Sequence, residues 1–129
     1  MNGRLLLDTN IVIALFARDA SIRTKLGQAT ETFVSIIALG ELCYGARKSG
    51  RVDANLARID EFASQSAVLG CDTETAREYG RIKNELRARG RPIPENDIWI
   101  AATAIQHQLT LVSRDDHFAE IDGLSLEKW

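Results

Sequence analysis

Four acidic residues are spread along the chain, each at or just after an apolar segment: Asp8, Glu41, Asp97 and Asp115. Placing carboxylates together or beside an apolar core costs free energy, because desolvation and mutual repulsion both oppose ionisation. The two clearest strand signals of the sequence both end at or near one of these aspartates. All-oxygen ligand sets are what hard cations such as Mg²⁺ and Mn²⁺ bind. The four residues therefore predict a divalent-cation site suited to phosphate chemistry.

Each of the four acidic residues also has a purely structural interpretation. Asp8 could cap a helix, because Asp is a favoured N-cap residue. Glu41 could be a solvated helix glutamate, and Asp97 could be an acidic first-turn residue that interacts with the helix dipole. Asp115 could cap a short helix that contains Phe118. We favour the metal site because two of the four positions are expected at the same edge of a sheet.

Short apolar runs alternate with longer helical patterns, which predicts an α/β fold. Leu5–Leu7 and Leu109–Ser113 have the continuous apolar character of buried strands. Strands that are separated by helices imply crossover connections and a mostly parallel sheet flanked by helices. In such sheets ligands bind beyond the carboxyl ends of the strands, which is where Asp8 and Asp115 fall. No interdomain linker interrupts the pattern, so residues 1–129 are predicted to form one domain.

The other elements are predicted from periodicity and capping residues. Asp72 or Thr73 is expected to cap one helix, and this helix should end at Gly90. That helix carries Ala76, Tyr79, Ile82 and Leu86 on one apolar face. Phe33–Ile36 is either a short strand or the lead-in to the next helix. The remaining predictions are helices at Thr9–Arg18, Leu39–Ala46 and Val52–Phe62, a helix whose first turn contains Asp97, and short strands at Ala67–Leu69 and Leu124–Leu126.

Composition sets broad limits on the kind of protein. The chain has 129 residues, of which 45% are hydrophobic, and this is ordinary for a globular core. No apolar run approaches the roughly 20 residues of a membrane span, and the first residues do not resemble a secretory signal. Cys43 and Cys71 lie in apolar contexts, which predicts buried, reduced thiols in a cytoplasmic protein. The net charge of −2 does not indicate nucleic-acid binding, but it is weak evidence either way, because bound metal would compensate the clustered carboxylates.

A basic segment precedes Asp97 and has two interpretations. It is either a solvated helix face, with Glu78 and Glu85 as pairing partners, or a stripe of cations that follows a nucleic-acid backbone. The candidate RNA-binding residues of this segment are Arg81, Lys83, Arg87, Arg89 and Arg91.

Other chemistries lack the residues that they need. The sequence contains no dinucleotide-binding, P-loop or serine-hydrolase motif. A phosphoaspartyl mechanism at Asp8 would favour a second aspartate at position 10, where Asn10 stands. His107 and His117 are interpreted as surface or capping residues rather than as metal ligands.

The segments LLLDTN, SIIALGELCYGA, PENDIWIAATA and LVSRDDHF together resemble the PIN domain family. More closely, they resemble the VapC-type ribonuclease toxins of prokaryotic toxin–antitoxin pairs. The resemblance covers essentially the whole chain, and the order and spacing of the four motifs make it specific. It implies a three-layer, single-domain PIN-like fold with a mostly parallel central sheet.

The resemblance also assigns roles to particular residues. Asp8, Glu41, Asp97 and Asp115 match the family's catalytic, metal-binding acidic quartet. The family's last motif is usually Thr-x-Asp, and its hydroxyl is kept here by a serine. Asp116 makes it ambiguous which of two adjacent carboxylates points inward. The polar positions that commonly support the quartet match Thr9, Asn10, Asn96 and Ser113.

The function implied by the resemblance is Mg²⁺- or Mn²⁺-dependent cleavage of RNA by a toxin. Its expected partners are an RNA substrate and a small VapB-like antitoxin, with a homodimer and higher toxin–antitoxin assemblies, and no membrane. The alternative is a catalytically silent PIN-like binding or scaffold module. Acidic residues stand at all four quartet positions, which favours the enzyme.

Overall fold

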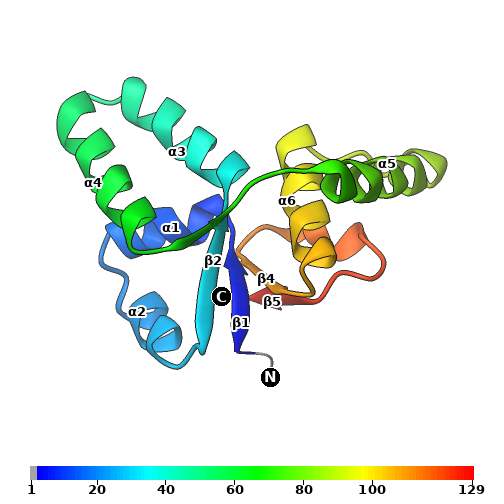
Figure 1. Cartoon of the computed structure of the whole chain (residues 1–129), viewed down its shortest axis with the longest axis horizontal. Helices are drawn as coiled ribbons and strands as arrows, with labels where there is room; N and C mark the ends of the chain where they lie inside the picture. Colours follow the sequence, from blue (N-terminus) through cyan, green and yellow to red (C-terminus); the bar gives the residue numbers. More distant parts are fainter. Residues whose placement is uncertain (1–2) are drawn as a thin grey trace.

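Five parallel strands form the centre of the protein, in the spatial order β3-β2-β1-β4-β5 (Figure 1). The computed structural model describes residues 3–129. Each pair of neighbouring strands is parallel, so the carboxyl ends of the strands all point to one edge of the sheet. The strands are β1 (Arg4–Leu7), β2 (Glu31–Ser35), β3 (Ala67–Leu69), β4 (Thr110–Ser113) and β5 (Leu126–Lys128).

Helices flank the sheet on both sides. In Figure 1 the first four helices lie to the left of the central strands, and α5 and α6 lie to the right. The predicted α/β fold, with a parallel sheet as the middle of three layers, is confirmed. The helices are α1 (Thr9–Phe16), α2 (Ala20–Gly27), α3 (Ile36–Arg47), α4 (Val52–Ser64), α5 (Thr73–Ala88) and α6 (Glu95–Gln106), with a 3₁₀ turn η1 at Asp116–Glu120.

The two central strands are covered on both faces. Leu5, Leu6 and Leu7 of β1 are buried, and so is every residue of β4. A strand covered by helices on both faces is apolar at consecutive positions rather than at alternate ones. The strand predictions at Leu5–Leu7 and Leu109–Ser113 are therefore confirmed, with β4 beginning one residue late.

Connections to the sheet bring particular helix ends to its carboxyl edge. Helix α1 begins directly after Asp8, and α3 begins directly after β2, with the Ser35 side chain accepting a hydrogen bond from Ile37 N. The segment Phe33–Ile36 thus contains both the end of a strand and the start of a helix. Helix α6 precedes β4 and runs antiparallel to it. Its N-terminal turn therefore lies at the carboxyl edge of the sheet.

Several predicted boundaries are wrong. The helix predicted at Thr9–Arg18 ends at Phe16, because Arg18 has a left-handed backbone with φ of 62°. A separate helix, α2, follows and was not predicted. The last strand is Leu126–Lys128 rather than Leu124–Leu126.

Helix α5 largely follows its prediction. Asp72 caps it, and Gly90, with φ of 67°, lies just beyond its end, as glycine commonly does. Ile82 and Leu86 are buried as expected. Ala76 is exposed, however, and Thr75 is the buried residue of that turn. The Thr75 hydroxyl accepts a hydrogen bond from Asp72 N in the capping box.

The cysteine prediction is correct in one respect only. Cys43 and Cys71 are both free thiols, but Cys71 is exposed and Cys43 is only partly buried. Cys71 follows the edge strand β3, whose Ala67 and Val68 are themselves exposed, so an apolar context did not mean burial there. Within residues 3–129, no helix has the length and apolarity needed to cross a membrane.

Candidate functional site

Asp8 is a buried carboxylate at the end of β1, with only 4% of its surface exposed. One of its oxygens accepts a hydrogen bond from Thr9 N at 2.8 Å, which caps α1. The other accepts a hydrogen bond from the Ser113 hydroxyl at 2.7 Å. The capping interpretation of Asp8 is therefore correct, but it uses only one of the two oxygens.

Burial raises the pKa of Asp8 from 3.8 to about 6. The hydrogen bonds from Ser113 and Thr9 lower this pKa, and the nearby charges of Asp97 and Glu41 raise it further. The neighbouring protein groups thus include carboxylates that oppose its ionisation, so a cation at this place would be favourable.

Ser113 ties the loop after β4 to the start of α1. Its hydroxyl donates to Asp8 and accepts a hydrogen bond from Asp115 N at 2.9 Å. The Asn10 amide lies 3.4 Å from the same hydroxyl, and its oxygen accepts a bond from Arg114 N at 3.2 Å. Ser113 and Asn10 therefore hold the Asp115 loop against the Asp8 turn.

Glu41 lies on α3 and faces the first turn of α1. Its carboxylate accepts a hydrogen bond from the Thr9 hydroxyl at 2.7 Å, although the two residues are 32 positions apart. Glu41 is half-buried, so it is not the fully solvated helix residue of the structural alternative. Thr9 links it to the Asp8 turn, which agrees with a supporting position for Thr9.

Asp97 lies in the first turn of α6, as predicted, and is close to Asp115 and His117. The Nδ1 atom of His117 is 3.2 Å from Asp97 Oδ2 and 3.0 Å from Asp115 Oδ1. Burial raises the pKa of Asp97, the charges of Asp115 and Glu41 add to the rise, and the hydrogen bond from His117 opposes it.

The four predicted acidic residues thus come from four different elements to one edge of the sheet. The charges of Asp97 and Glu41 contribute to the raised pKa of Asp8, and those of Asp115 and Glu41 contribute to the raised pKa of Asp97. Among the described residues, one group of three has ligand atoms that all lie within 4.8 Å of one another: Asp97, Asp115 and His117. These three atoms, rather than the whole quartet, form the compact cluster.

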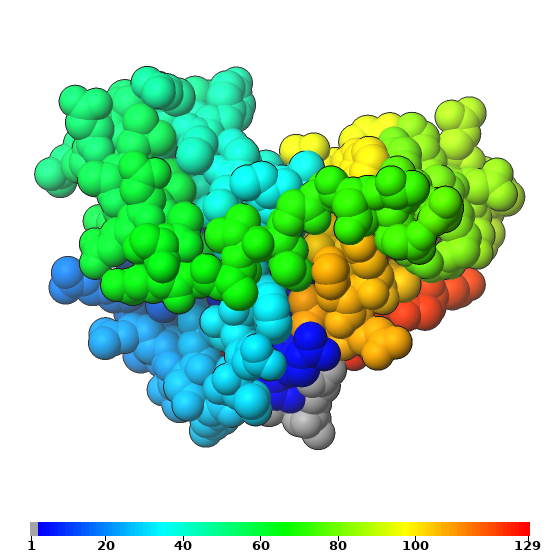
Figure 2. Space-filling view, in the orientation of Figure 1, coloured from blue at the N-terminus to red at the C-terminus, as the bar shows by residue number. Residues whose placement is uncertain are grey.

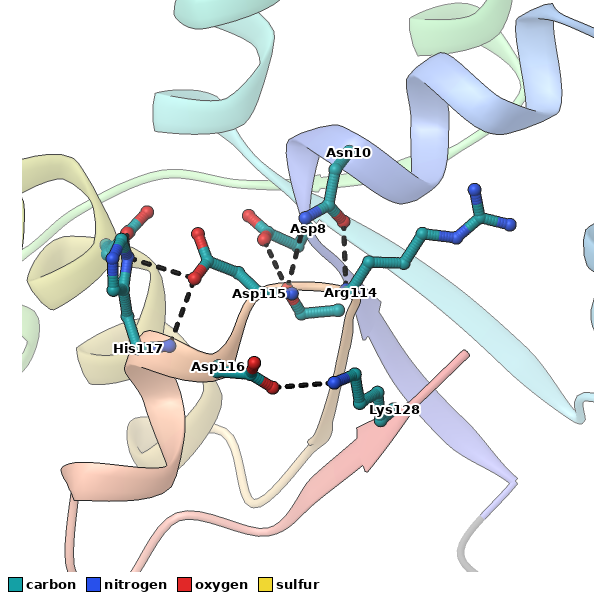
Figure 3. Close-up of polar contacts among 9 residues, drawn as sticks. Asp8, Asn10, Arg114, Asp115, Asp116, His117 and Lys128 are labelled. Carbon is teal, nitrogen blue, oxygen red and sulfur yellow. Dashed lines mark hydrogen bonds and ion pairs between the residues drawn. The ribbon is translucent and has the colours of Figure 1, made fainter.

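Asp115 and Asp116 point in different directions (Figure 3). The Asp115 carboxylate points toward His117, whose backbone N–H it also accepts at 3.0 Å as the cap of η1. Asp116 is exposed and pairs with Lys128 at 2.6 Å, which lowers its pKa. Geometry favours Asp115 as the inner carboxylate, and its role as a ligand stays a prediction.

Two other residues differ from the sequence analysis in their contacts. Asn96 is exposed, and within residues 3–129 no hydrogen bond joins its side chain to the quartet. His117 is a surface residue as predicted, yet it contacts two of the four carboxylates. The only signal in the sequence was its position two residues after Asp115, since the contact to Asp97 depends on the fold.

The basic residues of α5 and of the loop after it are mostly paired. Arg81 lies between Glu78 and Glu85, at 2.8 and 3.1 Å. The partners of the others are Glu95 for Lys83, Asp122 for Arg89 and Glu120 for Arg91. Within residues 3–129, Arg87 alone of the five candidates has no ion pair. Four of the five residues are thus paired, but only Arg81 pairs with the predicted partners Glu78 and Glu85. RNA binding by these residues stays a prediction.

A hollow between α3 and α6 opens beside Glu41, one of the four acidic residues. Its volume is about 810 Å³, and Figure 2 shows the upper rim of the molecule hollowed between these two helices. Glu41 lies in its wall. The other lining residues are Ile36, Ile37, Gly40, Tyr44, Gly45, Lys48 and Asn96. A polymeric substrate could approach the Glu41 carboxylate from this side.

Known proteins resemble the chain over almost its whole length. The PIN domain family model matches residues 5–124. The ribonuclease VapC2 of Haemophilus influenzae is 40% identical, and the tRNA(fMet)-specific endonuclease VapC of Shigella flexneri is 36% identical, each over 98% of both chains. The structure of VapBC2 from Rickettsia felis bound to a promoter DNA fragment contains a chain with a TM-score of 0.91, at 31% identity and 98% coverage of both chains.

Proposed function

The chain belongs to the PIN domain family, and from this membership we propose that it is a divalent-cation-dependent endoribonuclease and the toxin of a toxin–antitoxin pair. The names of its relatives, which are ribonucleases and a tRNA-specific endonuclease, support the reaction class. The observation that carries the proposal is the convergence of acidic side chains from four elements, with raised pKa values at Asp8 and Asp97.

The residues present fit a hard divalent cation. Carboxylates that raise one another's pKa are stabilised when a cation offsets their charges. Asp8, Glu41, Asp97 and Asp115 would hold Mg²⁺ or Mn²⁺ through oxygen atoms, the ligands that these ions prefer. When bound, the cation supplies activation of water and stabilisation of charge on the phosphate.

The chain's own groups fix the positions of these carboxylates. Ser113 and Thr9 N hold both oxygens of Asp8, and the Thr9 hydroxyl orients Glu41. Because these donors are neutral, they orient the carboxylates without removing their negative charge. The side chains of Asp97 and Asp115 are 13% and 32% exposed. Glu41 lies in the wall of the hollow between α3 and α6, through which we expect RNA to approach. We expect hydrolysis that leaves 5′-phosphate and 3′-hydroxyl ends.

The proposed protein partner is a VapB-like antitoxin made in the same cytoplasm. Support comes from the structural neighbour, which is a VapBC complex bound to promoter DNA. An Arg or Lys from the antitoxin would suit the acidic cluster, because a guanidinium pairs with carboxylates in a bidentate manner and competes with metal. We also propose that the toxin forms a homodimer and that toxin–antitoxin dimers assemble further.

The first test is RNA cleavage by the purified chain, free of antitoxin. Cleavage should require Mg²⁺ or Mn²⁺, stop in EDTA, and fall by about 1,000-fold or more in Asp97→Asn, a loss of about 4 kcal/mol in transition-state stabilisation. Asp53→Asn is a matched control, because Asp53 is an exposed first-turn acid of α4, whereas Asp97 belongs to the cluster. Equal cleavage in EDTA, or an active Asp97 variant, would contradict the proposal.

A second test separates the toxin from the silent scaffold. Expression of the chain alone should arrest growth, and co-expression with a neighbouring antitoxin frame should restore it. A chain that is harmless, well expressed and inactive with metal supplied would favour the scaffold, in which Asp8 and Asp115 serve only as helix caps.

A further inference from the structure

His117 is a nitrogen donor at the edge of the acidic cluster, outside the quartet of oxygen donors. Its Nδ1 atom lies 3.0 Å from Asp115 Oδ1 and 3.2 Å from Asp97 Oδ2. Figure 3 shows the imidazole beside the Asp115 carboxylate. The three donor atoms come from α6, the loop after β4 and η1, so the fold and not the local sequence assembles them.

The spacing of these atoms is that of neighbouring ligands on one ion. Two ligand atoms bound at about 2.1 Å, and at right angles to each other, lie about 3 Å apart. The two distances from Nδ1 are close to this value, and all three atoms lie within 4.8 Å of one another. Two of the three separations therefore fit neighbouring ligands on one ion, and the third, between Asp97 and Asp115, lies within 4.8 Å.

The backbone of His117 is also held in place. Its N–H donates to Asp115 Oδ1 at 3.0 Å, and the next residue, Phe118, is buried in the core. Asp116, on the other side, pairs with Lys128. These contacts limit the positions that the imidazole can reach, although about half of the side chain is exposed.

We propose that His117 is an imidazole ligand of the cation site and shifts its preference from Mg²⁺ toward Mn²⁺. Mg²⁺ is bound through oxygen and gives up its water reluctantly, whereas divalent transition-metal ions accept imidazole nitrogen more readily. The inference rests on the proposed function, because it adds a fifth protein ligand to the same site. A cationic imidazole would instead offset the carboxylates and compete with metal, so its removal would tighten metal binding.

Direct metal binding tests the proposal without measuring cleavage. Mn²⁺ and Mg²⁺ are titrated into metal-free wild-type protein, His117→Asn and His107→Asn, with Mn²⁺ followed by electron paramagnetic resonance. His107 is the matched control, because it caps the far end of α6. His117→Asn should weaken Mn²⁺ binding by about tenfold or more, and Mg²⁺ binding by less than about threefold.

A spectroscopic measurement identifies the ligand itself. Spin-echo modulation from ¹⁴N should accompany Mn²⁺ bound to the wild type and to His107→Asn, and should disappear in His117→Asn. A wild type that binds Mn²⁺ without this modulation overturns the inference, as does a His117 variant with unchanged or tighter Mn²⁺ binding. Those results leave the proposed function intact. A wild type that binds neither ion overturns both.

Discussion

Two charged regions of the protein are organised in opposite ways. At the carboxyl edge of the sheet, carboxylates of like charge lie near one another and are held mainly by neutral donors such as Ser113, Thr9 and backbone N–H groups. On α5, opposite charges alternate and pair, as Arg81 does with Glu78 and Glu85.

The two regions differ in how far their charges are paired. Most basic residues of the α5 face pair with acidic side chains, and these ion pairs are exposed to solvent, so each contributes little to stability. At the sheet edge burial raises the pKa values of Asp8 and Asp97, and the charges of the neighbouring carboxylates add to the rise. A set of charges that the protein orients but does not neutralise is suited to binding a cation.

The largest expected effect follows from the raised pKa of Asp8. In the metal-free protein its pKa is about 6 when folded and 3.8 in the reference state, a difference of about 3 kcal/mol. The folded state therefore binds more protons between these values. Stability should fall as pH rises from about 4 to about 6 and should level off above it.

Denaturant unfolding in EDTA at several pH values measures this effect. Asp8→Asn should remove most of the decline and should be more stable than the wild type above pH 6, while losing RNA cleavage. Added Mn²⁺ should stabilise the wild type more than the variant. A variant that is markedly less stable at every pH would mean that the cap on α1 is the main role of Asp8.

The strands that carry this site, and the position of its aspartates at their ends, could be predicted from the sequence. Continuous apolar runs identify β1 and β4, and aspartates at or after their ends are brought together by parallel pairing. Helix α2 could not be predicted by periodicity, because Ile22 is its only buried residue. The contact of His117 with Asp97 could not be predicted from the sequence either. It joins residues 20 positions apart, and His117 lies in a 3₁₀ turn whose position depends on the fold.

A second prediction compares two adjacent acids. Asp115 points toward His117 and Asp97, whereas Asp116 pairs with Lys128 at the surface. Asp115→Asn should lower RNA cleavage by about 10- to 100-fold, as expected for a lost interaction at a metal site. Asp116→Asn should change cleavage by less than about threefold, because it removes only an exposed ion pair. A dead Asp116 variant beside an active Asp115 variant would reverse the assignment.

The smallest effects are expected on the α5 face, where Arg81 and Arg87 differ in pairing. Arg81→Gln removes two exposed pairs and should lower the free energy of unfolding by less than about 1 kcal/mol. It should leave RNA affinity within about twofold, because Arg81 is already paired.

Arg87 has no ion pair among the described residues and is available to a phosphate. In binding assays with a cleavage-inactive Asp97→Asn background, Arg87→Gln should reduce the salt dependence of RNA binding by about 0.7 in the log–log slope. Equal losses of affinity and slope for the two variants would mean that ion pairing does not prevent these arginines from binding RNA. The contrast between the two regions would then be weaker than their contacts indicate.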